Sequence, residues 1–177
     1  METSSVKLFN AMNASDLIKN TDPVIIIAHN LRTPENIGMI MRLAANIGAR
    51  LTLFAFDEET EFRESKIKRT SSGAIEKTNW KIISSNEIID HLPNDYKIVA
   101  LETSDNSQNI YQFTFPKKTA LLVGNEVTGL SADILKIANH EVFIPVPGNL
   151  YSLNVTHALA IGLFQWLRQI SSNLGSP

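Results

Sequence analysis

Short apolar runs recur along the chain, and segments with helical periodicity separate them. The runs are three to five residues long, too short for helices, rich in β-branched residues and apolar on both faces, as the strands of a parallel sheet are. They lie at Val24–Ala28, Leu51–Ala55, Ile98–Leu101, Ala120–Val123 and Val142–Ile144, with a weaker candidate at Trp80–Ile83. The pattern predicts a mostly parallel sheet.

Helices are expected between these strands. The candidates lie near 34–47, 85–92, 131–139 and 153–171, and a further helix is considered around 3–19. Strands that alternate with helices are typical of an α/β layer fold. We therefore expect one domain over residues 23–171, preceded by an N-terminal extension over 1–22 and followed by a frayed tail over 172–177.

The helix expected over 34–47 has well-marked ends, since Thr33 can cap it and Gly48 follows it. Its buried stripe is predicted to be Ile37, Ile40, Met41, Ala44 and Ile47. Asn36 then lies at the helix start and Arg42 about 9 Å further along the axis, and a long side chain that leans back can bring the two into one pocket. Gly38 is expected to permit a close approach by a backbone or a ligand. The spacing fits a surface arginine equally well.

The loop over 123–131, Val-Gly-Asn-Glu-Val-Thr-Gly-Leu-Ser, leaves a buried strand and ends where Ser131 can cap a helix. Ligands of open parallel sheets bind beyond the carboxyl ends of strands, so this loop and the segment 144–156 are candidates to share one site. The loop has neither the lysine of a P-loop nor the spacing of a dinucleotide-binding motif. The carboxylate of Glu126 favours hydroxyls, an amine or a cation over a phosphate.

The segment 144–156 combines a strand end, a turn and a polar helix start. Its two prolines remove backbone donors and fix φ, Gly148 permits a turn, and Ser152 or Asn154 can cap the next helix. These residues build a rigid polar ledge suited to a ligand. An ordinary strand-to-helix loop explains them too.

Composition narrows the class of protein. The chain has 177 residues, 44% of them hydrophobic, and no cysteine, which fits a reducing compartment. Its N-terminus has no basic start before an apolar run, and no apolar stretch approaches the roughly 18 residues of a membrane span. We expect a cytoplasmic protein without membrane insertion. The four histidines show no metal-ligand spacing, and no metal is expected.

The net charge of −2 gives no global attraction to nucleic acid. One local basic patch comprises Arg63, Lys66, Lys68, Arg69, Lys77 and Lys81. Taken alone, these residues favour an ordinary solvated surface.

Three segments in order carry a family resemblance. They are Asn36-Ile-Gly-Met-Ile-Met-Arg42, the run from Leu122 to Ser131, and the run from Ile144 to Thr156. They resemble the three motifs of the SpoU branch of the SPOUT RNA methyltransferases, and the run from Arg69 to Ala74 resembles a further family segment. The resemblance covers residues 23 to 170. It implies a ribose 2′-O-methyltransferase that uses S-adenosylmethionine, whereas a catalytically silent RNA-binding relative is the alternative. A nucleotide-dependent reductase is disfavoured by the lack of G-x-G-x-x-G.

The resemblance also changes the expected fold, because periodicity alone favours an unknotted sheet. It implies a SPOUT fold in which segments around 120–131 and 142–156 form a deep C-terminal trefoil knot with the last helix threaded through. That helix is apolar around most of its girth, as a helix buried on two sides is. Gly162 would permit close helix approach. The resemblance implies a homodimer through this helix, in which Arg42 acts in its own site or the partner's.

The resemblance assigns residues to the cofactor and the reaction. S-adenosylmethionine is expected to contact Leu122, Gly124, Asn125, Glu126, Ile144, Val146, Ser152, Leu153 and Asn154. The catalytic residues are expected to be Asn36, Arg42, Ser152 and Asn154. The family proposal makes Arg42 a base, but a guanidinium with a pKa above about 12 is better suited to hold a phosphate and stabilise the developing alkoxide. Asn36 would orient Arg42 or the ribose.

RNA is the expected partner, with transfer RNA favoured over ribosomal RNA by analogy. Only about twenty residues precede the first strand, so recognition is expected to use the catalytic domain's own surface. Arg63, Lys66, Lys68 and Arg69 are the expected phosphate contacts.

Overall fold

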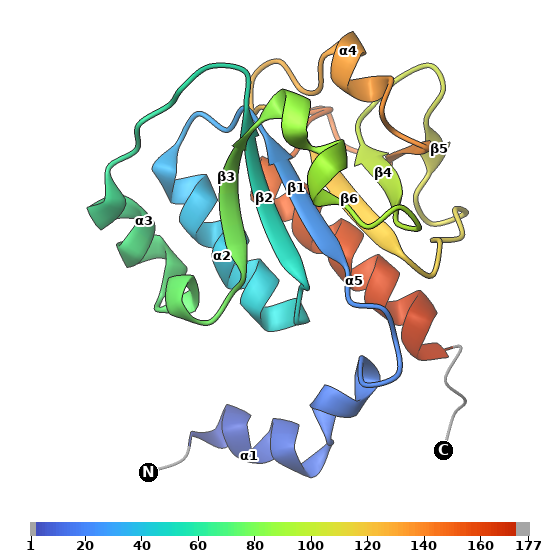
Figure 1. Cartoon of the computed structure of the whole chain (residues 1–177). Coiled ribbons are helices and arrows are strands. Elements are labelled where there is room, and N and C mark those ends of the chain that lie inside the picture. The colour runs from blue at the N-terminus through green and yellow to red at the C-terminus, as the bar shows by residue number, and fades with distance from the viewer. Residues whose placement is uncertain (1–2, 173–177) are drawn as a thin grey trace.

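The computed structural model describes residues 3–172. Its centre is a seven-stranded sheet in the order β3-β2-β1-β6-β4-β7-β5 (Figure 1). The strands are β1 (Ile25–His29), β2 (Leu51–Phe56), β3 (Trp80–Ser84), β4 (Lys97–Leu101), β5 (Gln108–Asn109), β6 (Thr119–Val123) and β7 (His140–Phe143). Every pairing between them is parallel. The six predicted strands are confirmed, and β5 escaped prediction because it is two polar residues long.

Strand order in the sheet departs from strand order in the chain at β6. The strands β1, β2 and β3 run toward one edge, β4, β7 and β5 lie on the other side, and β6 lies between β1 and β4. Both β1 and β6 are buried along their whole length. In an open parallel sheet, the point where strand order reverses leaves a crevice at the carboxyl ends. The loops after β1 and β6 frame that crevice.

One face of the sheet is covered by α2 (Pro34–Ile47) and α5 (Val155–Ser172). The ends of α2 are as predicted, since Thr33 Oγ1 accepts from the Asn36 amide at 3.4 Å and Gly48 ends the helix with a φ of 66°. Its predicted apolar stripe is buried. The capped helix is therefore fixed at the end that carries Asn36.

A further helix, α3 (Glu64–Ser71), packs against α2. Gly38 explains the close approach, because a Cβ at that position would lie 2.0 Å from Thr70 Oγ1 and 2.6 Å from the Ile67 carbonyl oxygen. The expected backbone approach at Gly38 is thus confirmed, and the neighbour is α3. The helix itself was not predicted, since its eight residues include a single large apolar side chain.

The opposite face is covered by short elements, and two helix predictions there are wrong in extent. Residues 85–92 form two 3₁₀ turns, η3 (Ser85–Glu87) and η4 (Ile89–His91), because a capping box at Ser84 and the proline at 93 leave no room for a longer helix. The helix expected over 131–139 is only α4 (Ala132–Leu135). It stops because Asn139 turns back to bond Ile98 through both backbone and side chain.

The helix α5 matches its prediction, with its apolar stripe against the sheet and Phe164 exposed. The expected role of Gly162 needs correction. A Cβ there would meet Leu121 Cδ2 at 2.9 Å and Leu101 Cδ2 at 3.5 Å, so the glycine accommodates the sheet and not another helix. Ser172 still belongs to α5, and the rest of the predicted tail lies outside the described residues.

The N-terminal segment forms α1 (Ser4–Ala11) and a 3₁₀ turn, η1 (Ala14–Leu17), in place of one helix over 3–19. Asn13 breaks the segment by adopting a φ of 47°. None of the residues of α1 is buried, and Figure 1 shows α1 standing away from the sheet. Within residues 3–172, no helix has the length and apolar character needed to cross a membrane.

Candidate active site

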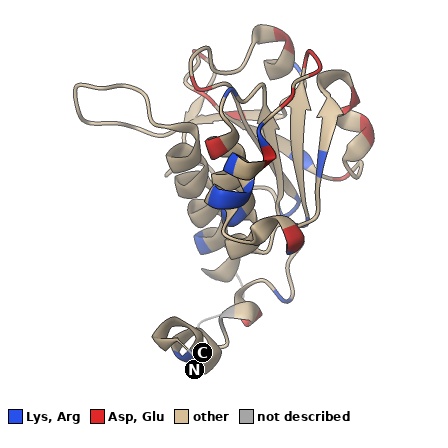
Figure 2. Cartoon of the chain, turned by 90° about the vertical axis from the view of Figure 1, so that its left-hand side faces the viewer, with Lys and Arg blue, Asp and Glu red and all other residues tan. Residues whose placement is uncertain are grey.

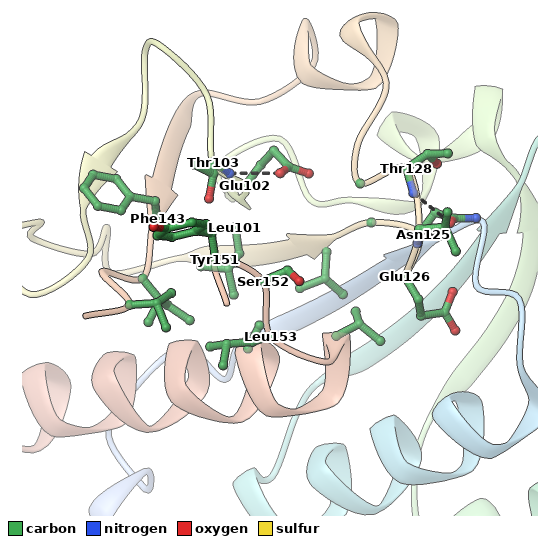
Figure 3. Close-up of a pocket in the computed structure, with 18 residues that line it drawn as sticks. Leu101, Glu102, Thr103, Asn125, Glu126, Thr128, Phe143, Tyr151, Ser152 and Leu153 are labelled. Atoms are coloured by element: carbon green, nitrogen blue, oxygen red, sulfur yellow. Dashed lines mark hydrogen bonds between the residues drawn. The ribbon is translucent and has the colours of Figure 1, made fainter. Parts of the chain in front are cut away.

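A cavity of about 320 Å³ lies at the carboxyl edge of the sheet, beside the start of α5 (Figure 3). Three segments distant in sequence line it. They are Leu101–Thr103 after β4, Val123–Gly129 after β6, and residues from the loop between β7 and α5, namely Phe143, Ile144, Val146, Tyr151, Ser152 and Leu153. The predicted pairing of the 123–131 loop with the 144–156 segment is confirmed.

Most of the residues expected to contact a cofactor line this cavity. They are Gly124, Asn125, Glu126, Ile144, Val146, Ser152 and Leu153. Leu122 is fully buried within β6 and is not among the lining residues. Asn154 also lies outside the lining and caps α5, where its Oδ1 accepts from the Thr156 amide at 2.9 Å and hydroxyl at 2.6 Å. Leu122 thus belongs to the core and Asn154 to the helix cap, and their contact with a cofactor stays a prediction.

The loop after β6 is closed on itself. Asn125 and Gly129 exchange two backbone hydrogen bonds of 3.2 and 2.9 Å. A Cβ at Gly124 would lie 2.5 Å from the Gly129 carbonyl carbon, so no side chain fits there without displacing the loop. The two glycines therefore hold a tight turn against the cavity.

Glu126 connects this loop to the segment before α2. Its carboxylate accepts hydrogen bonds from Asn36 Nδ2 at 2.6 Å, the Arg32 amide at 2.9 Å and Thr33 Oγ1 at 3.3 Å. Asn36 is only 7% exposed. The first and second motif residues are thus joined directly, which spacing along the chain did not reveal.

The environment of Glu126 keeps it ionised. Burial by itself raises the pKa of this carboxyl, but the hydrogen bonds from Asn36, Arg32 and Thr33 outweigh burial and lower the pKa below its ordinary value. The carboxylate is consequently committed to the protein, although Glu126 is one of the residues that line the cavity.

Neither Arg42 nor Asn36 is among the residues that line the cavity. Arg42 is exposed and is absent from the cavity lining, and its Nη1 donates to Ser72 Oγ at 3.4 Å. Ser72 adopts a left-handed φ of 51° just after α3. The arginine therefore lies along the α2–α3 side of the molecule.

Sequence reasoning missed the contribution of the segment after β4. Glu102 lines the cavity, and its Oε2 accepts from the Leu130 amide at 2.7 Å. Thr103 and Tyr151 line it as well, and Tyr151 is 80% exposed. A polar residue at the end of β4, which is a position of ligand binding in parallel sheets, was the signal available.

Four residues of the predicted basic patch, Arg63, Lys66, Lys68 and Arg69, lie on α3 or at its start (Figure 2). Lys77 lies beyond α3 and Lys81 lies in β3. Lys66 pairs with Glu35 at 3.0 Å and Lys68 with Glu64 at 3.5 Å. Arg63 and Arg69 are exposed and have no ion-pair partner within residues 3–172. Lys77 and Lys81 are likewise exposed and without an ion-pair partner in the described part of the chain, so these four cations are available to an external anion.

The cavity is large enough for a small organic cofactor. Its volume lies within the range of small-molecule sites, and apolar residues such as Leu101, Val123 and Leu153 alternate with polar ones such as Ser152 and Asn125. Across residues 3–172, no cluster of three or more His, Asp or Glu side chains forms a metal-binding group. His29 is buried, and His140 and His157 are exposed.

The parallel sheet, with a cavity among the loops at its carboxyl edge, defines an α/β protein of the class that binds ligands at that edge. The profile of the SpoU rRNA Methylase family matches residues 23–164, and the chain belongs to this family of RNA methyltransferases. The expected family membership is thus confirmed, as is the parallel α/β fold.

Named relatives act on different RNAs. The tRNA (guanosine(18)-2′-O)-methyltransferase of Aquifex aeolicus is 29% identical over 86% of this chain and 72% of its own length. The 23S rRNA (guanosine-2′-O-)-methyltransferase RlmB of Acinetobacter baylyi is 26% identical over 92% of this chain and 66% of its own length. This chain therefore spans about two thirds to three quarters of these relatives.

A solved structure supports the same assignment. The SpoU methyltransferase AviRb from Streptomyces viridochromogenes, in complex with the cofactor AdoMet, superposes with a TM-score of 0.76 and 26% identity over 89% of this chain. This chain covers 64% of AviRb. The family's use of S-adenosylmethionine thus agrees with the cofactor expected from the sequence.

Proposed function

We propose that this chain transfers the methyl group of S-adenosylmethionine to a ribose 2′-hydroxyl of RNA. The observation that carries this proposal is the hydrogen bond between Asn36 and Glu126, which holds the start of α2 beside the cavity described above. In-line methyl transfer requires that the methyl donor and the ribose be held next to each other. The hydrogen bond meets this requirement by fixing the polar start of α2 beside the cavity proposed for the donor.

The cofactor is proposed to occupy the cavity described above. Its adenosine would lie against Gly124 and Asn125, with Ile144 and Val146 as the apolar wall and Leu153 on the adenine side. Bound S-adenosylmethionine would supply a methyl group on a sulfonium: the ribose oxygen would take the methyl as the S–C bond breaks, S-adenosylhomocysteine would leave as the neutral thioether, and the hydroxyl proton would pass to water. Ser152 lies at the cavity wall and can orient the donor, while Asn154 holds the helix start that presents it.

Arg42 is proposed to bind the phosphate beside the target ribose and to stabilise the developing alkoxide, and Asn36 to orient the ribose. A guanidinium stays protonated at neutral pH, so its role is electrostatic and not that of a base. Its direction away from the cavity of its own chain supports action in the cavity of a partner subunit.

A homodimer through the C-terminal helix follows from this reading. Large apolar side chains beside the cavity and on α5 are exposed, among them Leu150 at 82%, Tyr151 at 80% and Phe164 at 54%. Leu150 and Tyr151 are adjacent in the chain, and exposed apolar side chains that lie together favour burial against another surface. The catalytic unit proposed is residues 23–171, with the loops after β6 and β7 knotted as the family resemblance implies.

RNA would approach over α3, with Arg63, Lys66, Lys68 and Arg69 as phosphate contacts. Transfer RNA is proposed as the substrate in preference to ribosomal RNA, and the cytoplasm as the place of action. A catalytically silent RNA-binding relative is the second candidate, and cofactor affinity separates the two.

The Arg42→Lys variant tests this function. It keeps the positive charge but loses the planar two-donor fork, so methyl transfer to RNA should fall by tenfold or more while S-adenosylmethionine affinity changes less than twofold. Transfer of labelled methyl groups and calorimetric titration of the cofactor measure the two effects.

Arg50→Lys is the matched control, because Arg50 is exposed at the start of β2 and lies over the Tyr96 ring, away from the cavity. Near-normal transfer by Arg42→Lys would remove the proposed role of this arginine. Absence of cofactor binding by the unmodified chain would contradict the enzymatic function itself.

A further inference from the structure

A second cavity of about 400 Å³ lies at the same carboxyl edge of the sheet and is lined by residues that follow β2, by η3 and η4, and by residues in and around α4. None of the residues assigned above to the cofactor, the reaction or the basic patch lines it. Its polar wall contains Asp57, Ser85, Asn86 and Asp133, and its apolar wall consists of isoleucines. A cavity of this size and mixed lining is suited to an organic ligand.

Asp57 is held rigidly at the wall of this second cavity. Its carboxylate contacts His29 Nε2 at 3.1 Å and accepts from Asn30 Nδ2 at 2.6 Å, while its backbone amide donates to Asn30 Oδ1 at 3.0 Å. Hydrogen bonds from Ser85, Asn30 and His29 lower the pKa of Asp57, against the opposing effect of burial. A negatively charged acceptor is therefore fixed in position at neutral pH.

Hydrogen bonds link the wall of the second cavity to the wall of the first. Asn125, which lines the first cavity, donates from Nδ2 to the Asn30 carbonyl at 2.7 Å, and Asn30 in turn holds Asp57. Asn30 adopts a left-handed φ of 51° to make both contacts. Asp57 follows β2 and Gly124 follows β6, and these strands are two positions apart, so the nearest walls of the two cavities lie about 10 Å from each other along the sheet edge. A single nucleoside is comparable in length.

The chemistry of the second cavity favours a nucleobase over the sugar-phosphate backbone of an RNA. The carboxylate of Asp57 repels phosphate, whereas Asp133 is paired with Lys136 at 2.7 Å. The exposed side chain of Ile89, together with Ile134 and Ile137, offers apolar surface to a flat ring. Guanine has three N–H groups on its Watson–Crick edge, more than the other RNA bases, and carboxylates accept such groups strongly.

We propose that the second cavity binds the guanine base of the nucleotide whose ribose is methylated, with Asp57 as the acceptor for its N–H edge. The inference rests on the proposed function for RNA as the ligand. It makes Asp57 a determinant of base specificity, at a position that none of the three family motifs includes.

Binding of short RNA tests this site without the cofactor. The probes are a pentanucleotide with one guanosine among uridines and the same RNA with inosine, which lacks the N2 amino group. The wild-type chain should bind the guanosine RNA about tenfold more tightly than the inosine RNA, because the loss of roughly one hydrogen bond to a charged group changes affinity by about this factor. In Asp57→Asn the two affinities should agree within twofold.

Two further variants complete the test. Asp90→Asn removes an exposed carboxylate next to the cavity but not in its lining, and should keep the tenfold preference. Ile89→Ala trims a side chain that is 53% exposed, so the fold is preserved, and it should weaken both RNAs equally. Backbone amide resonances of Asn86 and Ile89 should shift on binding of the guanosine RNA.

The outcomes separate this inference from the proposed function. Equal affinity for guanosine and inosine RNA in the wild type, or a preference retained by Asp57→Asn, overturns the base site even where methyl transfer is observed. A preference that depends on Asp57 in a chain that transfers no methyl group upholds the base site and overturns the proposed reaction.

Discussion

The amide of Asn36 connects two segments that lie ninety residues apart in the chain. Its Nδ2 donates to Glu126 at 2.6 Å, within a nearly buried environment. A charge-assisted hydrogen bond of this kind is stronger than one between neutral groups. We infer that Asn36 positions the loop after β6 as much as it positions a substrate.

The Asn36→Asp variant should reveal this role through its pH dependence. Two carboxylates would face each other at hydrogen-bond distance, so unfolding at pH 7 should cost about 2 kcal/mol less than in the wild type. One carboxyl of the pair would then have a raised pKa in the folded state, so the loss of stability should diminish as the pH falls through that pKa. Chemical denaturation between pH 5 and 8 measures this change.

Asn46→Asp on the exposed side of the same helix is the control and should stay within about 0.5 kcal/mol at every pH. In the wild type, the stability changes with pH in the opposite direction. The pKa of Glu126 is lowered in the folded state, so this carboxylate stabilises the fold above its ordinary pKa, and that stabilisation is lost as the pH falls toward the folded-state pKa. An Asn36→Asp variant with the stability profile of Asn46→Asp would show that the hydrogen bond is unimportant.

Individual residues were predictable where local rules apply. The cap at Thr33 and the glycine at 48 followed from helix-end chemistry. The partner of Asn36 and the contribution of Glu102 were not predictable, because both depend on which strand ends lie side by side. That order is a property of the sheet and is absent from any local pattern.

At the scale of elements, α3 is the helix that sequence periodicity failed to predict and that carries the proposed RNA contacts. Its sequence is too short and polar to show an apolar stripe. Packing against the flat surface at Gly38 stabilises it instead. The apolar strands and α2 were predictable because the apolar residues in their own sequences indicate that they are buried.

Replacing Arg63 and Arg69 with glutamine should weaken RNA binding and reduce its dependence on salt. Each phosphate contact releases about 0.7 counterions from single-stranded nucleic acid, so the slope of log affinity against log salt should fall by about 1.4 if both arginines make one contact. Fluorescence anisotropy at several salt concentrations measures the slope.

The control replaces Lys97 and Lys117 with glutamine, since both are exposed near the starts of β4 and β6, at the opposite edge of the sheet. The same charge is removed there without touching α3. A slope that falls equally in both double variants would assign RNA binding to overall charge and not to the α3 patch.

At the scale of the whole molecule, the insertion of β6 between β1 and β4 brings the separate motifs together. It places the loops after β1, β4 and β6 around one edge, with α5 closing the first cavity and α4 closing the second. Local sequence patterns predicted the strands but not this order, which family resemblance alone could indicate. The two cavities divide the proposed reaction between a donor side and a base side.

Identification of the modified nucleoside tests the central claim most directly. The full chain is incubated with S-adenosylmethionine and unmodified transfer RNA or ribosomal RNA, and the RNA is digested to nucleosides for mass spectrometry. The account predicts a 2′-O-methylated nucleoside with the wild type that is lost or strongly reduced with Arg42→Lys. A methyl group found on a base, or no methylation of any RNA by a chain that binds the cofactor, would contradict it.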